Sequence, residues 1–217
     1  VVYTDKENDD AYKGHFIDGG KVLLNMHRHL TISDILAFST GFSDVMKSFL
    51  LYLDDEGVSD FVSKIDEYVR EPQKLHQAYP DFFDSSDKEA KSARKTIAAI
   101  RKRIRHLIDE GKGLHSDQSN LVENVFKYLE QGKTVIIDLS LKDTTDAGII
   151  STILVRKLFE HNKSEFTSNK PGAVIETVIF VEEAQNVLSE DLVKTNANPF
   201  VRCAKEGRKF RLGMVAI

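Results

Sequence analysis

The sequence predicts an α/β protein in which a parallel sheet has flanking helices and a helical subdomain is inserted into it. After residue 131, the β-rich runs "TVIIDLS", "ETVIFVEE" and "LGMVAI" alternate with helical patterns. Such alternation predicts right-handed crossovers and parallel strands. Residues 31–131 instead show helical periodicity almost throughout.

These patterns predict three regions. Residues 1–30 are expected to add a strand and a hairpin to the core, with Gly19-Gly20 as the turn between two apolar stretches. Residues 31–131 are expected to form the helical insertion subdomain. Residues 132–217 are expected to form the C-terminal part of the core.

Helices within the insertion are predicted where apolar residues return every three or four positions. This periodicity covers residues 31–50, residues 59–69 with Ser59 as the cap, residues 86–109 and residues 121–129. The prolines and the Asp/Ser cluster of "REPQKLHQAYPDFFDSSD" instead predict a loop.

Composition excludes several classes of protein. The longest apolar runs fall far short of the roughly 20 residues that cross a bilayer, and "VVYTDKENDD" lacks the apolar segment of a signal peptide. The single cysteine, Cys203, excludes an intrachain disulfide framework and is typical of a reducing compartment. We therefore expect a cytoplasmic protein without membrane association. The start at Val1 and the end inside the strand-like "RLGMVAI" predict a piece of a longer protein.

Two adjacent carboxylates, Glu182 and Glu183, follow the predicted strand in "VIFVEEAQNV". A lone buried acid costs several kcal/mol unless it is paired, so we expect the pair to face a cation. Ligands bind at the carboxyl ends of parallel strands. There, one carboxylate can hold Mg²⁺ while its neighbour polarises an attacking water. In a second interpretation, which the spacing leaves open, one acid caps the next helix and the other is solvated. Asp138, at the end of the preceding strand, is predicted to be a polar strand terminus.

The tripeptide Gly132-Lys133-Thr134 matches the end of a phosphate-binding loop. That loop requires G-x-x-x-x-G-K-[ST] between a strand and a helix. Here position 127 is Lys, a helix precedes the tripeptide and a strand follows it. We therefore interpret the tripeptide as a turn.

Two groups of cations have two interpretations each. Arg208 and Lys209 lie between a helix and a strand. There they can reach a phosphate group bound by a neighbouring subunit, or they can simply interact favourably with the negative end of the helix dipole. The basic run from Arg101 to Arg105 is interpreted as a solvated helix face, with contact to DNA or a subunit as the alternative. The seven histidines show no spacing typical of a metal site, and Cys203 is interpreted as a packed core thiol.

"TVIFVEEAQNVL" followed by "NPFVRCAKEGRKFRLGMVAI" resembles the Walker B and post-Walker B region of HerA-like ATPases, in the HerA–FtsK superfamily of P-loop DNA motors. The upstream "GKTVIIDLSLKDTTDAGIISTILVRKLFEHN" resembles the family's preceding strand and helix, so the resemblance covers about residues 132–217. This sequence departs from the family pattern at four positions. They are Glu182 where Asp is usual, Gln185 where His is common, Lys205 in place of Arg and Arg211 in place of Gly.

The resemblance implies a partial RecA-like core that binds ATP and Mg²⁺. It implies that Glu182 is the metal-associated acid, that Glu183 is the catalytic glutamate, and that Arg208 is an arginine finger toward a neighbouring subunit. The implied partners are further copies in a hexameric ring, duplex DNA, and a nuclease such as NurA. Because the Walker A loop is absent from the sequence, the chain alone is expected neither to bind nor to hydrolyse ATP.

Two other functions remain open at this stage. A non-catalytic scaffold or interaction module could derive from such an ATPase, which Glu182 in place of Asp leaves possible. A conjugative or secretion-type coupling ATPase of the same superfamily is the third interpretation.

Overall fold

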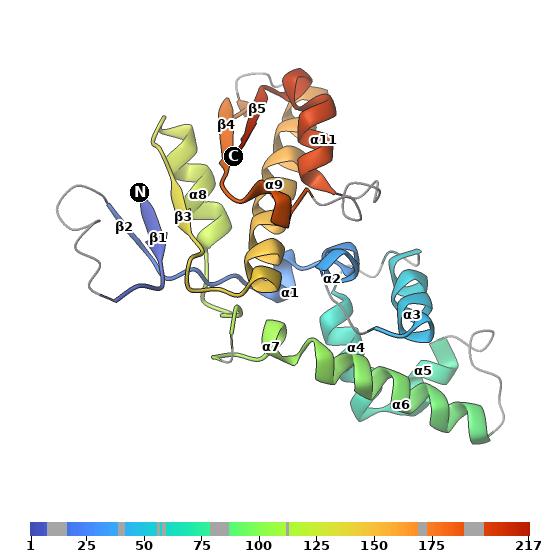
Figure 1. Cartoon of the computed structure of the whole chain (residues 1–217). Helices are drawn as coiled ribbons and strands as arrows, with labels where there is room; N and C mark the ends of the chain where they lie inside the picture. The colour runs from blue at the N-terminus through green and yellow to red at the C-terminus, as the bar shows by residue number, and fades with distance from the viewer. Residues whose placement is uncertain are drawn as a thin grey trace. The chain divides into compact units, whose positions relative to one another are not determined.

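The computed structural model describes residues 1–7, 17–38, 42–55, 57, 60–78, 87–111, 113–168, 173–188 and 198–217. The chain divides into two compact units, one of Val1–Leu24 with Ser119–Ile217 and one of Asn25–Gln118. The first unit is α/β and the second is helical (Figure 1). No described helix has both the length and the apolar character needed to cross a membrane. The predicted α/β class is confirmed.

The described residues of the α/β unit form two small sheets, in which all of the pairing is parallel. In the first sheet, β1 (Val2–Thr4) lies between β2 (Asp18–Gly20) and β3 (Ile136–Asp138). In the second sheet, β4 (Thr177–Val181) pairs with β5 (Leu212–Ala216). The β-branched runs therefore form the strands that the sequence predicts.

The described α-helices of this unit are α8 (Leu121–Glu130), α9 (Thr144–Thr167) and α11 (Pro199–Glu206). Two 3-10 turns, η2 (Ala184–Asn186) and η3 (Gly207–Phe210), follow β4 and α11. α9 contacts α8, α11 and η3, and α11 also packs on β5 (Figure 1). α9 begins where the Asp143 side chain accepts a hydrogen bond from the Asp146 N–H (2.8 Å).

Asn162 of α9 connects the amino ends of β4 and β5. Its side chain is fully buried, and Nδ2 donates to the carbonyl oxygens of Ile175 and Phe210 (2.9 Å each). Oδ1 accepts from the Ile175 N–H (3.0 Å). Because Ile175 precedes β4 and Phe210 ends η3, one amide side chain fixes the points where both strands begin.

The helical unit contains seven described helices. They are α1 (Met26–His29), α2 (Ile32–Phe38), α3 (Asp44–Asp55), α4 (Phe61–Arg70), α5 (Pro72–Ala78), α6 (Asp87–Arg103) and α7 (Arg105–Ile108). α4 packs against α5 and α6, and α3 packs against α2 and α6. Buried aliphatic side chains from α3, α4 and α6, including Leu50, Ile65 and Ile100, form the core.

The hairpin predicted at Gly19-Gly20 is wrong. Both glycines lie in β2, which pairs with β1 in parallel. A Cβ atom at Gly19 would lie 2.8 Å from ring atoms of Tyr3. The glycine therefore makes room for a buried aromatic ring, and a reversal of the chain is not its role.

Four helix predictions need correction. The stretch 31–50 forms two helices, α2 and α3, and the stretch 86–109 is interrupted at Ile104 between α6 and α7. The predicted loop contains α5, which begins at Pro72, because proline is favoured at the first helical position. Asp60 caps α4 by accepting from the Ser63 N–H (3.0 Å), while the predicted cap, Ser59, lies outside the described residues.

Candidate functional site: an open acidic edge

The carboxyl ends of β4 and β5 lie at one edge of the second sheet. Val181 is in register with Ala216, and the pairing continues where the Ile217 N–H donates to the Val181 carbonyl oxygen (3.0 Å). Glu182 and Glu183 follow β4 directly at this edge. The structure therefore places both predicted acids where parallel sheets bind ligands.

Glu183 has a left-handed backbone conformation, with φ of 52° and ψ of 44°. This conformation costs a residue with a Cβ atom roughly 1–2 kcal/mol. The next residue is held by the end of the chain, because the Ala184 N–H donates to the Ile217 carbonyl oxygen (3.1 Å). The Gln185 side-chain amide donates to the Glu183 carboxylate. Such a strained position is a feature that functional sites often have.

The turn after the acids is anchored to the N-terminus of α11. The Asn198 Nδ2 atom donates to the Val187 carbonyl oxygen (2.9 Å), and its Oδ1 accepts from the Phe200 N–H (2.9 Å). Ala184 and Val187 are buried. Asn198 thereby caps α11, with Pro199 in the first helical position.

Both acidic side chains are exposed to solvent, and no described cation lies within ion-pair distance of either carboxylate. The strand before them is open on one face, since Val178 is 57% exposed and Phe180 is 67% exposed. The cation that the acid pair is expected to face is therefore not a side chain of the described residues. Exposed carboxylates are hydrated, so they need no such partner, and they are available to a cation from solution.

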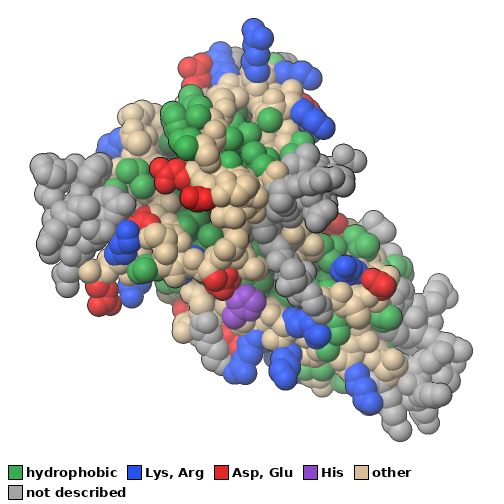
Figure 2. Space-filling view, viewed as in Figure 1, with side chains coloured by type: hydrophobic (Ala, Val, Ile, Leu, Met, Phe, Trp, Pro, Cys, Tyr) green, Lys and Arg blue, Asp and Glu red, His purple; other side chains and the backbone are tan. Residues whose placement is uncertain are grey.

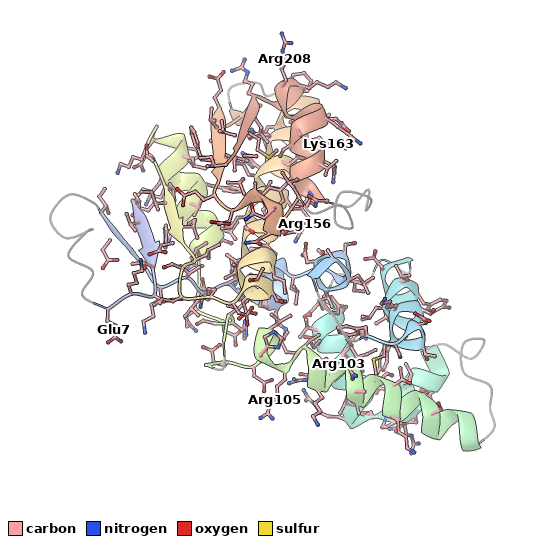
Figure 3. The ribbon with its side chains drawn as sticks, viewed as in Figure 1. Glu7, Arg103, Arg105, Arg156, Lys163 and Arg208 are labelled. Carbon is pink, nitrogen blue, oxygen red and sulfur yellow. The ribbon has the colours of Figure 1, made fainter. Side chains whose placement is uncertain are left out.

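Arg208 lies in η3, at the end of the sheet where β5 begins, and its side chain extends outward (Figure 3). The five residues of β5 rise about 3.3 Å each, so about 16 Å of strand separates η3 from the acidic edge. The structure does not bring Arg208 together with Glu182 or Glu183. Any joint role for them requires two copies of the chain.

The carboxyl edge of the first sheet carries a second charged cluster. Asp138, at the end of β3, accepts from the Thr4 hydroxyl (3.0 Å) and pairs with Lys6 (3.1 Å), and its other oxygen accepts from the Ser140 N–H (3.0 Å). Partial burial by itself raises the pKa of Asp138, but the hydrogen bonds from Ser140, Lys6 and Thr4 outweigh it and lower that pKa to about 2. The prediction of a polar strand terminus therefore agrees with these contacts.

A second ion pair lies beside it, between Asp5 and Lys142 (2.7 Å), with both side chains mostly buried. This network was not predicted from the sequence. The signal for it is that an Asp and a Lys follow each strand, in "YTDK" and in "DLSLK".

The Gly132-Lys133-Thr134 tripeptide is a turn between α8 and β3, as predicted. Gly132 has a φ of 70°, and its N–H donates to the Leu129 carbonyl oxygen (2.9 Å). The Lys133 ammonium lies 5.1 Å from the centre of the Tyr128 ring. These contacts close the end of α8, in the manner of a helix C-terminal glycine.

The helical unit brings together His27, His115 and Asp117, with one potential ligand atom of each within 4.8 Å of the others. The distance of His27 in sequence from His115 and Asp117 hid this cluster. The buried His115 accepts at Nδ1 from the Met26 N–H (3.1 Å) and lies 3.3 Å from Asp117 through Nε2. A neutral imidazole that accepts at Nδ1 carries its proton on Nε2, so that nitrogen has no free lone pair for a metal. The cluster stabilises the start of α1.

Cys203 is a buried thiol of α11. Burial raises its pKa to about 11, so it is protonated near neutral pH and unreactive. The predicted packed thiol is confirmed.

Comparison with known proteins gives one distant relationship. No protein-family model and no solved structure matches the chain. Over 94 residues, which are 43% of this chain, the sequence is 29% identical to the DNA double-strand break repair helicase HerA of Sulfurisphaera tokodaii. The matched part spans 19% of that helicase. The chain therefore has a distant HerA-like relationship and corresponds to about a fifth of the relative's length.

Proposed function

We propose that this chain is part of an ATP-hydrolysing DNA translocase of HerA type, with a RecA-like core whose Walker B acids are Glu182 and Glu183. The observation that carries the proposal is the exposed acid pair at the carboxyl end of β4, with Glu183 in a left-handed conformation. The distant similarity to a DNA repair helicase supports this choice over other uses of an acidic edge.

In this proposal Glu182 would hold Mg²⁺, and Glu183 would orient and deprotonate the attacking water. Both carboxylates are exposed and have no cationic partner among the described residues, which suits a hard cation that prefers oxygen ligands. Bound Mg²⁺–ATP supplies the phosphoryl group, whose developing charge the metal neutralises. The printed sequence has no G-x-x-x-x-G-K-[ST] loop, and we propose that a segment outside it holds the phosphates.

Arg208 would act on a neighbouring copy. Its exposed guanidinium lies at the opposite end of β5 from the acids, and an arginine finger supplied from another subunit needs that kind of outward position. We therefore propose a homo-oligomeric ring, hexameric by its resemblance to HerA-like motors, that acts on duplex DNA with a nuclease partner such as NurA.

The test is steady-state Mg²⁺-dependent ATP hydrolysis by the full-length protein that contains this chain, with and without duplex DNA. General-base catalysis contributes about 10²–10⁴-fold, so Glu183→Gln should lower the DNA-stimulated rate by that factor. Glu176→Gln is the matched control, because Glu176 precedes the opposite end of β4 and its only ion pair among the described residues is with the exposed Arg211 (2.7 Å).

Two outcomes would contradict the proposal. Full hydrolysis by Glu183→Gln would remove that residue from the chemistry. A parent protein without hydrolysis under any of these conditions would favour the non-catalytic scaffold, in which the acids only end the strand.

A further inference from the structure

Helices α6 and α7 carry a concentration of positive charge in an otherwise acidic chain. Residues 91–106, "KSARKTIAAIRKRIRH", contain seven Lys or Arg residues and no Asp or Glu, although the net charge of the chain is −4. Figure 2 shows Lys and Arg side chains gathered over α7 and the adjoining part of α6.

The two helices have one apolar and one cationic face. Ala93, Ile97, Ile100, Ile104 and Leu107 are buried, and α6 packs against α3 and α4. The exposed cations are those of Arg94, Lys95, Lys102, Arg103 and Arg105, which we call the α6–α7 basic face. In Figure 3 the Arg105 side chain extends away from its helix.

Ion pairs engage part of this surface. Arg101 pairs with Asp66 of α4 and with Asp109 (2.6 Å), and Arg105 pairs with Asp109 (2.8 Å). Among the residues that the structure describes, Arg94, Lys95 and Lys102 have no ion pair. The charge that remains without a partner therefore points away from the core.

The spacing of two of these lysines suits a polyanion with a regular repeat. Lys95 and Lys102 are seven residues apart, which places them on one helix face and about 10 Å apart along its axis. The phosphates of one DNA strand rise about 3.4 Å each along the duplex axis. Because the phosphates also wind around the duplex axis, the two ammonium groups can contact different phosphates of a backbone that passes along this helix face.

The composition of the surface distinguishes a nucleic acid from a protein partner. The centre of a protein–protein interface is enriched in aromatic and other apolar residues and depleted of charge. Within the described part of α6 and α7, no large apolar side chain is exposed. A cationic surface without an apolar centre fits a phosphate backbone.

We propose that the α6–α7 basic face binds the phosphate backbone of duplex DNA, with Lys95 and Lys102 as two of its contacts. The inference rests on the proposed function for the choice of duplex DNA, and it identifies the surface that would hold it. Phosphate contacts carry no sequence information, so we expect this binding to be independent of DNA sequence.

The test is fluorescence anisotropy of a labelled 30-base-pair duplex with this chain, without nucleotide, between about 50 and 200 mM KCl. Each phosphate contact adds about 0.9 to the slope of log K against log salt. Lys95→Gln/Lys102→Gln should therefore reduce that slope by about 1.8, so the variant loses about tenfold less affinity than wild type over this range. Lys47→Gln/Lys163→Gln, which removes two exposed cations on α3 and α9, should match wild type.

Three outcomes would overturn the inference: no duplex binding by wild type, equal slopes for the two double variants, or poly-glutamate binding as tight as duplex binding. The last would identify a general surface for acidic partners. Because the assay contains no nucleotide, it separates this inference from the proposed function. If DNA binding depends on Lys95 and Lys102 but the protein never hydrolyses ATP, the DNA-binding surface would stand and the proposed translocase function would be rejected.

Discussion

The carboxyl ends of the two sheets present acids in opposite environments. Asp138, after β3, has a side chain that is 9% exposed and bound by Lys6, Thr4 and Ser140. Glu182 and Glu183, after β4, are exposed and face no described cation. Both edges belong to the same unit and the same type of sheet, so their neighbours make the difference. Charges that are matched internally hold strands together, whereas unmatched acids can bind a cation from solution.

The largest effect on stability is expected at Asn162, which fixes β4 and β5 at the end of the sheet opposite the acids. Asn162→Ala would leave the Ile175 N–H and the carbonyl oxygens of Ile175 and Phe210 without this partner. An unsatisfied buried group costs about 1–3 kcal/mol, so the free energy of unfolding should fall by about 3 kcal/mol or more in urea denaturation. The exposed neighbour provides the control Lys163→Ala, which should change it by less than about 0.5 kcal/mol. Similar values for both variants would mean that Asn162 does not hold the strands.

The edge after β3, where Asp138 is paired internally, should show a smaller effect on the free energy of unfolding, and that effect should depend on pH. Asp138→Asn removes the charge that Lys6 and the Ser140 N–H stabilise. The pKa of Asp138 falls from 3.8 to about 2 on folding. After a reduction for solvent screening at the half-exposed Lys6, this shift corresponds to a loss of about 1–2 kcal/mol in the free energy of unfolding of Asp138→Asn at pH 7.

The sign of the pH dependence follows from the lowered pKa of Asp138. The unfolded chain binds this proton at higher pH than the folded chain does, so the stabilisation is complete above about pH 4 and is lost as pH falls toward 2. Urea denaturation of wild type and Asp138→Asn at several pH values measures it. A stability difference that persists at pH 2 would contradict the assignment.

Substitutions at the acidic edge after β4 should have the smallest effect on the free energy of unfolding. That effect comes from the backbone conformation of Glu183. Glycine adopts positive φ without strain, but it carries an entropic penalty of about 0.5–1 kcal/mol elsewhere. Glu182→Gly should therefore lower the free energy of unfolding by about that amount, while Glu183→Gly should leave it unchanged or raise it by up to about 1 kcal/mol. Equal losses for the two variants would mean that Glu183 is not strained.

Local patterns predicted most of the elements, and a long-range contact accounts for the error at Gly19. The runs that became β3, β4 and β5 depend on neighbouring residues, so the sequence was sufficient for them. Gly19 was misinterpreted because the reason for it is the ring of Tyr3, which is distant in sequence.

In the candidate site, too, some features follow from local sequence and others depend on distant residues. Its position at the end of β4 followed from the strand pattern, but its exposure did not. An apolar run such as "VIFV" does not reveal that Val178 and Phe180 lie on a solvent-exposed face of the sheet. The network around Asp138 joins residues more than 130 positions apart, and only the parallel pairing of β1 and β3 brings them together.

We propose that the edge after β4 takes part in ATP hydrolysis and that the edge after β3 stabilises the fold. The most direct test measures ATP hydrolysis and thermal unfolding of the full-length protein for Glu183→Gln and Asp138→Asn side by side. We predict that Glu183→Gln loses DNA-stimulated hydrolysis by about 10²–10⁴-fold with an unchanged Tm. Asp138→Asn should have a lower Tm and near-normal hydrolysis per folded molecule. A Glu183→Gln variant that retains hydrolysis, or one whose only change is a lower Tm, would contradict the account.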